Sequence, residues 1–297
     1  MGGKPRVRTA PDGIVVIDKP AGMTSHDVVA RMRRVCGTRA VGHAGTLDPM
    51  ATGVLIIGVE RATKLLGHLT LAAKTYDATI RLGESTTTDD ADGEVVARTS
   101  AADVTDAAIR AASTVFSGPI AQRPSAVSAI KVDGVRSYAR VRAGEDVELP
   151  ERDITIHAFT IHAIRHIGDV IDVDVTVRCS AGTYIRALAR DLGAALGVGG
   201  HLTALRRTAS GNYTIADAQP LPDVTGTVTM TPLVDVLSRE FAVVQLDAGS
   251  AQQVRHGIRV PAVNPPGGLC GLLDEHGAVI ALSEAANGVW KHAAVFA

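Results

Sequence analysis

The sequence has few cysteines, no long apolar run and no excess of basic residues. Its three cysteines, Cys36, Cys179 and Cys270, stand far apart and form no Cys-x-x-Cys pair, which argues against a zinc site or a disulfide framework. The apolar run at residues 54–57 is far shorter than the roughly 20 residues that a membrane helix needs. With 46% hydrophobic residues to build a core, we expect a globular cytoplasmic protein without membrane association.

Charge alone argues against a nucleic-acid partner. Thirty Lys and Arg residues against 31 Asp and Glu give a net charge of -1, whereas nucleic-acid-binding proteins are usually basic. The basic residues nevertheless gather in four groups, at residues 31–39, 131–142, 206–207 and 255–259. Any one group is as well explained by a solvated helix face, but four together favour a polyanionic partner.

The N-terminal part of the chain predicts a strand, a helix and a second strand. Residues 13–20 form an apolar run closed by a proline, which is typical of a buried strand. Ser25 can cap a helix whose apolar stripe ends at Gly37. The run at residues 54–59 predicts another buried strand.

Two later segments alternate clearly between apolar and polar residues. Residues 74–83 predict a strand with Tyr76 on its apolar face, and residues 170–179 give the strongest strand signal in the chain. A helix capped by Thr183 is expected next, with Tyr184 and Arg186 in its first turn.

The remaining segments are less regular. A helix is predicted near residues 104–117, and residues 83–94 form an acidic loop without the ligand spacing of a calcium-binding EF-hand. Residues 122–153 show little periodicity and suggest an extended insertion or flap. The stretch 219–232 is typical of a boundary, and a small β-rich module is expected after it.

The stretch GHAGTLDPMATGVL, residues 42–55, offers one carboxylate, Asp48, and one imidazole, His43. An Asp before Pro is more often a turn former than a catalytic group, and a lone His is more often structural. The loop lacks the spacing of a phosphate-binding loop or dinucleotide fingerprint, a second carboxylate for glycosidase chemistry and a nucleophile elbow. What remains is a carboxylate that acts alone, as nucleophile or base, supported by an arginine and an aromatic ring.

Five motifs occur in one order along the chain: DKPAGMTS at 18–25, GHAGTLDPMATGVL at 42–55, KTYDATIRLG at 74–83, CSAGTYIRALARDLG at 179–193 and LTALRRTASG at 202–211. Together they resemble the bacterial TruB family of tRNA pseudouridine-55 synthases. One departure is Ala44, where many relatives carry Thr, a small change that casts little doubt on activity.

The resemblance implies that Asp48 is the catalytic aspartate, which attacks the target uridine so that the base detaches, rotates and rejoins the ribose through carbon. Whether Asp48 attacks the uracil ring or the sugar instead loses a proton stays open. Tyr76 would stack on the flipped uracil and take part in proton transfer, and Arg186 would pair with Asp48.

The resemblance also assigns residues that contact the substrate or the RNA. Leu205 would be an apolar wall of the pocket, and His43 would insert into the T-loop where the flipped base had been. Tyr184, Lys19 and Lys64 complete the predicted set, the two lysines supporting either the catalytic loop or the RNA.

The implied architecture is an α+β pseudouridine-synthase fold, a largely antiparallel mixed sheet with flanking helices. Residues 1–230 would form the catalytic domain, with a thumb-like RNA-gripping insertion at about 122–153, and residues 231–297 a PUA-like RNA-binding domain. No metal or other cofactor is expected. The expected partner is the T-arm stem-loop of tRNA, bound by a monomer that needs no protein partner or guide RNA.

Two alternatives remain open. The protein could be an RNA-folding factor that flips and releases the T-arm, with modification incidental. It could also be a guide-RNA-dependent synthase of the dyskerin type, although the sizeable insertion and the absence of long charged tails favour a stand-alone enzyme.

Overall fold

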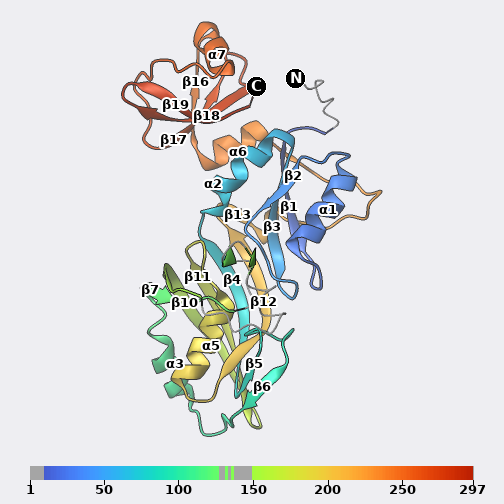
Figure 1. Cartoon of the computed structure of the whole chain (residues 1–297), viewed down its shortest axis with the longest axis vertical. Coiled ribbons are helices and arrows are strands. Elements are labelled where there is room, and N and C mark those ends of the chain that lie inside the picture. Colours follow the sequence, from blue (N-terminus) through green and yellow to red (C-terminus); the bar gives the residue numbers. More distant parts are fainter. Residues whose placement is uncertain (1–9, 127–130, 133–134, 137–148, 297) are drawn as a thin grey trace.

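The structure, a computed structural model, describes residues 10–126, 131–132, 135–136 and 149–296. The molecule is elongated, with a small C-terminal sheet at one end and a larger sheet running through the rest (Figure 1). No helix in the described ranges is long and apolar enough to span a membrane.

The larger sheet has eleven strands, and its main path runs β14-β1-β3-β12-β4-β11-β10-β7. The strands on this path are β14 (Gln219–Pro220), β1 (Gly13–Lys19), β3 (Thr52–Val59), β12 (Gly200–Ser210), β4 (Lys74–Leu82), β11 (Val170–Cys179), β10 (Arg152–Ile167) and β7 (Gly118–Gln122). Off the path lie β2 (Val41–Ala44), β13 (Tyr213–Thr214) and β15 (Thr231–Pro232). Within the described sheet only β1–β14 and β3–β12 pair in parallel, so the predicted largely antiparallel mixed sheet is confirmed.

The joint between β3 and β12 is short. The two strands pair only at Arg206 with Thr52 and at Arg207 with Gly53. Gly53 has a φ of 98°, and a Cβ there would lie 2.2 Å from the carbonyl oxygen of Arg207, so only glycine fits. This joint brings the loop before β3 against the middle of the sheet.

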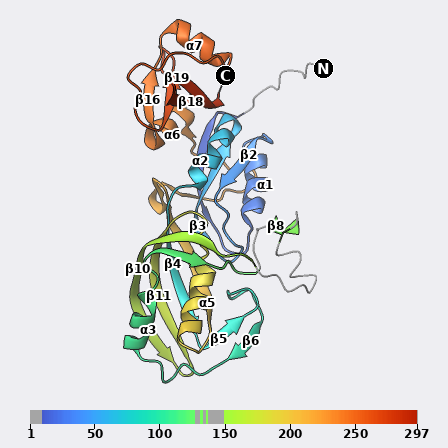
Figure 2. The ribbon, with the colours of Figure 1, turned by 60° about the vertical axis from the view of Figure 1, so that its left-hand side comes forward.

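Among the described residues, three helices cover one face of the sheet: α1 (Ser25–Val35), α3 (Asp106–Ser113) and α5 (Ile185–Ala195). Figures 1 and 2 show α3 and α5 over the β4 end of the sheet and α1 beside β1 and β3. The predicted alternation in β4 is confirmed, since Tyr76, Ala78, Ile80 and Leu82 all enter this core. Tyr76 therefore lies on the helix-covered face.

The other face is covered at the β1–β3 end by η1 (Glu60–Leu65), α2 (Leu66–Thr70) and α6 (Leu233–Glu240). The C-terminal unit joins this second core through Leu282 and Phe296. It consists of β16 (Ala242–Gln245), α7 (Ala248–Arg255), β17 (Leu269–Leu273), β18 (Val279–Ala286) and β19 (Val289–Val295), packed around Trp290. A small β-rich C-terminal unit is thus present as predicted.

Both predicted helix caps differ from the structure. The N-cap of α1 is Thr24, because its side chain and that of Asp27 form a reciprocal capping box. Ser25 instead bonds both the backbone N–H and the carbonyl of Leu47, at 2.9 and 3.1 Å. The N-cap of α5 is Tyr184, which has an extended backbone, and the hydroxyl of Thr183 donates to the carbonyl of Ser180 instead of capping the helix.

The helix expected near 104–117 is the shorter α3. The segment expected as an acidic loop, 83–94, contains the short strand β5 (Glu84–Thr86) and is followed by β6 (Val95–Arg98). Of the predicted insertion at 122–153, the structure describes the two ends and the short strands β8 (Lys131–Val132) and β9 (Val135–Arg136). The rest of the predicted thumb lies outside the described residues.

Candidate active site

A cavity of about 240 Å³ lies beside the joint of the sheet. Five of the eight residues predicted for the site line it: Asp48, Tyr76, Tyr184, Arg186 and Leu205. They come from the loop between β2 and β3, from β4, from the start of α5 and from β12. The fold therefore brings together residues up to 157 positions apart, from Asp48 to Leu205.

The loop that carries Asp48 is tied to the segment between β1 and α1. The two hydrogen bonds of Ser25 hold Leu47, and the N–H of Gly22 donates to the carbonyl of Pro49 at 2.9 Å. The ammonium group of Lys19 donates to the same carbonyl at 3.2 Å. Both chain neighbours of Asp48, Leu47 and Pro49, are thus held by hydrogen bonds.

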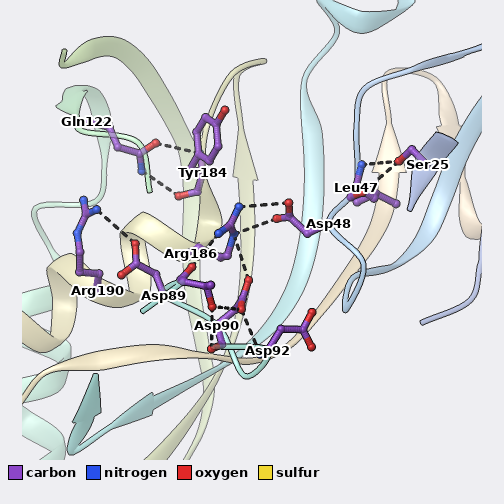
Figure 3. A network of polar contacts seen from close by, with 11 residues as sticks. Ser25, Leu47, Asp48, Asp89, Asp90, Asp92, Gln122, Tyr184, Arg186 and Arg190 are labelled. Carbon is purple, nitrogen blue, oxygen red and sulfur yellow. Dashed lines mark hydrogen bonds and ion pairs between the residues drawn. The ribbon is translucent and has the colours of Figure 1, made fainter. Parts of the chain in front are cut away.

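Asp48 and Arg186 form a bidentate ion pair, with Nε to Oδ2 at 2.9 Å and Nη2 to Oδ1 at 3.2 Å (Figure 3). Arg186 is 3% exposed, whereas the Asp48 side chain keeps 36% of its surface open. A buried guanidinium stabilises the ionised carboxylate beside it. The arrangement presents a charged carboxylate to the cavity with its orientation fixed.

The acidic loop supplies further acceptors for Arg186, which the sequence did not reveal. Nη1 of Arg186 donates to the carbonyl of Thr88 at 2.7 Å, and Nε lies 3.5 Å from the carboxylate of Asp90. Asp90 is 4% exposed and also accepts from the backbone N–H of Asp92. Within the described residues no three His, Cys, Asp or Glu side chains are placed to hold a metal ion. Part of the acidic loop thus holds the arginine.

Tyr76 and Leu205 form the apolar part of the cavity. They are 8% and 7% exposed, and they come from the paired strands β4 and β12. Burial raises the pKa of Tyr76, with the nearby Arg207 opposing the shift. The phenol is therefore neutral at physiological pH and offers an aromatic face with an O–H donor.

Arg207 is a cavity residue that the sequence reading placed in a basic surface group. It is 1% exposed, and its guanidinium donates to the carbonyls of Val54 at 2.7 Å and Gly45 at 2.9 Å. The neighbouring Arg206 pairs with Asp18. The expectation of a basic surface group at 206–207 is wrong, because strand alternation sends one side chain inward and the other is neutralised.

Lys19 lies behind the loop that carries Asp48. It is fully buried, and besides Pro49 it donates to the carbonyls of Pro20 at 2.9 Å and Met23 at 2.6 Å. Burial lowers its pKa to about 8, with the charge of Asp48 opposing the shift. This geometry fits the loop-supporting alternative of the two predicted for Lys19. Lys74, which unlike Lys19 lines the cavity, has its pKa lowered to about 8 by burial.

The remaining predicted residues lie at separate places in the fold. His43 lies in β2, edge-on to His26 with ring centroids 5.4 Å apart, and burial lowers its pKa to about 4. Tyr184 has the Arg152 guanidinium 5.4 Å from its ring centroid. Lys64 donates to the carbonyl of Val295 in the C-terminal strand. In the described structure His43, Lys19 and Lys64 are not among the residues that line the cavity.

Comparison with known families gives two matches along the chain. Residues 33–185 match the model of the "TruB family pseudouridylate synthase (N terminal domain)". Residues 186–239 match the model of the "tRNA pseudouridylate synthase B C-terminal domain". The two matches join within the first turn of α5, between Ile185 and Arg186.

Curated proteins named tRNA pseudouridine synthase B are similar over most of the chain. That of Thermobifida fusca is 54% identical over 292 residues, covering 96% of this chain and 99% of the relative. That of an Arthrobacter species is 58% identical over 252 residues, covering 84% of this chain and 82% of the relative.

Solved structures are similar in fold. A structure of an H/ACA ribonucleoprotein bound to a substrate RNA containing 2'-deoxyuridine aligns with a TM-score of 0.66 and 26% identity, over 92% of this chain and 78% of that chain. A Cbf5-Nop10-Gar1 complex aligns with a TM-score of 0.64 and 27% identity, over 92% and 78%. The matching family models, the curated relatives and the structures of similar fold therefore all belong to one class of protein.

Proposed function

Because this chain belongs to the TruB family of pseudouridylate synthases, we propose that it isomerises uridine 55 in the T-loop of tRNA to pseudouridine. The observation that carries the proposal is the carboxylate of Asp48, open to the cavity and held by the buried Arg186. The related proteins are named for tRNA, and several of their sequences match nearly the whole chain.

Asp48 is the proposed catalytic residue. In the isomerisation the N1–C1' bond of the nucleoside breaks, a C5–C1' bond forms, the proton on C5 passes to solvent, and N1 takes up a proton from solvent. Asp48 assists bond breaking either by adding to the uracil ring or by accepting a proton from the sugar. Both routes need an ionised carboxylate with a fixed direction, and the bidentate pair with Arg186 supplies both properties.

A uridine inside a folded loop cannot reach Asp48, so the base must flip out of its stack. Tyr76 offers its ring as a stacking surface, Leu205 closes the apolar side, and Tyr184 lies at the cavity rim. Tyr76 is also the proposed proton-transfer group. We assign His43, neutral because its pKa is lowered, to the space that the flipped base leaves in the T-loop.

The basic group at residues 31–39, in α1 and just after its end, is the described group best placed for phosphates, since Arg33, Arg34 and Arg39 are exposed. We propose that the β-rich, PUA-like unit at 231–297 also binds RNA. Lys64 contributes to RNA binding only from outside the cavity, through the surface it shares with the C-terminal strand.

We further propose that the protein acts as a monomer on bare tRNA, in the cytoplasm, without a metal, guide RNA or protein partner. Isomerisation exchanges no electrons and needs no activated co-substrate. The structural relatives from the H/ACA ribonucleoprotein and the Cbf5-Nop10-Gar1 complex are 26–27% identical, whereas the tRNA-named relatives exceed 50%.

The test uses two tRNA transcripts with tritium at C5 of their uridines, one with uridine and one with cytidine at position 55. Purified protein with a chelator and no other component should release label from the first transcript only. Release from both transcripts would contradict the T-loop position. Release from neither, despite tight salt-sensitive binding, would contradict the enzymatic function and support the folding-factor or guide-dependent alternative.

A further inference from the structure

Gln122 is the last residue of β7, where the chain enters the 122–153 insertion. It pairs in register with Arg152, the first residue of β10, where the chain returns. Gln122 is 2% exposed, although a glutamine at a strand end would ordinarily be solvated. The burial of its amide therefore calls for hydrogen-bond partners.

The partners of Gln122 are both backbone groups of Tyr184. Its Nε2 donates to the carbonyl of Tyr184 at 3.0 Å, and its Oε1 accepts from the N–H of Tyr184 at 2.9 Å (Figure 3). The side-chain amide thus makes the same two hydrogen bonds with Tyr184 that the backbone of a neighbouring strand could make. Tyr184 is the N-cap of α5 and makes no capping bond with its own side chain. Gln122 therefore fixes the point at which α5 begins.

The start of α5 determines where Arg186 lies, because Arg186 is its second residue. Arg186 must meet Asp48 and the carbonyl of Thr88 at the same time, at distances of 2.7 to 3.2 Å. A shift of the first turn by about 1 Å would break this set, and displacements of that size lower rates strongly.

Two further contacts join the same stem to the same helix. The guanidinium of Arg152 lies 5.4 Å from the ring centroid of Tyr184, and Nη2 of Arg190 donates to the carbonyl of Arg123 at 2.8 Å. The ends of the insertion thus hold α5 at its N-cap and, six residues or nearly two turns further on, at Arg190. The predicted RNA-gripping segment and the catalytic pair share one rigid connection.

We propose that Gln122 is a positioning residue for the reaction: it sets the first turn of α5, and thereby Arg186, against Asp48. The inference rests on the function proposed above. It names a residue that touches neither the cavity nor the catalytic pair and acts only through the backbone of Tyr184.

The first test is Gln122→Glu, which keeps the shape of the side chain. The ionised carboxylate cannot donate to the Tyr184 carbonyl, so kcat for label release should fall about tenfold to a hundredfold, with the Kd for a T-arm hairpin unchanged. Lowering the pH should restore activity relative to wild type, because a protonated carboxyl donates again. Among the described residues, the charged side chains beside Gln122 in sequence or register are Arg123, just after β7, and Glu151 and Arg152 at the start of β10, with Arg186 on α5.

A second variant, Gln122→Met, removes both hydrogen bonds and should lose activity without recovery at low pH. Gln219 provides the matched control, because its amide makes the same two bonds, to the carbonyl and N–H of Thr229, away from the cavity. Gln219→Glu should leave kcat unchanged.

The outcomes separate the two proposals. Active wild type with equally active Gln122→Glu and Gln122→Met would overturn the positioning role. Losses of kcat that merely follow a lower melting temperature, or that are as large in Gln219→Glu, would overturn it too. Inactive wild type would instead refute the proposed function.

Discussion

Two aspartate–arginine pairs flank the joint of the sheet, and they differ in one respect. Asp48 pairs with Arg186 beside the cavity, and Asp18 pairs with Arg206 on the face of β12 that points away from it. Both pairs are bidentate, and the aspartate side chains are similarly exposed, at 36% and 34%. The arginines differ, since Arg186 is 4% exposed in its side chain and Arg206 is 40%.

We propose that the burial of its arginine makes the Asp48 pair reactive, whereas the Asp18 pair is an ordinary surface pair. Arg206 can exchange its carboxylate for water, and exposed pairs contribute only about 0–1 kcal/mol to stability. Arg186 has no such freedom, because Thr88 and Asp90 hold it from the other side. Asp48 is thus charged, immobile and open at once, and the following changes test this difference.

Replacing Asp48 by Asn should have the largest effect. It removes the charge that reacts and keeps the shape, so label release from tRNA should fall by a factor on the order of 10⁴ or more. Binding of the T-arm hairpin should persist. Asp18→Asn is the control and should keep wild-type kcat. If Asp48→Asn still modified tRNA at a rate near wild type, Asp48 would not be the catalytic residue.

Replacing Tyr76 by Phe should lower kcat by about 10²-fold if the phenol transfers a proton, because general acid–base groups contribute this much. The ring, and with it hairpin affinity, is kept. Tyr213→Phe is the matched control, since Tyr213 is a buried tyrosine on the other face whose hydroxyl has no hydrogen-bond partner in the described structure. This control should keep kcat and stability. Wild-type kcat in Tyr76→Phe would restrict Tyr76 to stacking.

The smallest expected effect is on the free energy of unfolding at low pH, which depends on the protonation of His43. Its folded pKa of about 4 lies below the ordinary 6.5, so the unfolded chain binds the proton more tightly between these values. The free energy of unfolding should therefore fall as pH drops from 6.5 towards 4, with His43 contributing on the order of 1 kcal/mol.

His43→Phe should flatten this part of the pH–stability curve measured by urea unfolding. The exposed His157→Phe serves as control and should leave the slope unchanged. An unchanged slope in His43→Phe would contradict the burial of the neutral imidazole.

Local sequence patterns predicted the strands that have one polar face. β4 and β11 alternate because one face packs under α3 and α5 while the other bears Asp, Thr and Arg side chains, so the period is visible in the residues themselves. The predicted caps lie one residue from the observed ones because neighbouring polar side chains compete for the cap. At α1 the reciprocal bond between Thr24 and Asp27 decides between Thr24 and Ser25.

The candidate site was predicted in part, through motif residues near the loop of Asp48. Arg207 and Asp90 were missed because their roles depend on sheet order. β12 lies between β3 and β4, which buries one arginine, and the acidic loop reaches Arg186 from a distant part of the chain. No local period contains that information.

The most direct test of the central difference compares Arg186→Lys with Arg206→Lys in single-turnover label release from tRNA. Lysine keeps the positive charge but loses the bidentate fork. We predict that Arg186→Lys lowers the rate of the chemical step about 10²-fold or more, as removal of a fixed electrostatic group does, while Arg206→Lys matches wild type. Equal rates for the two variants would contradict the claim that a buried arginine makes the Asp48 pair reactive.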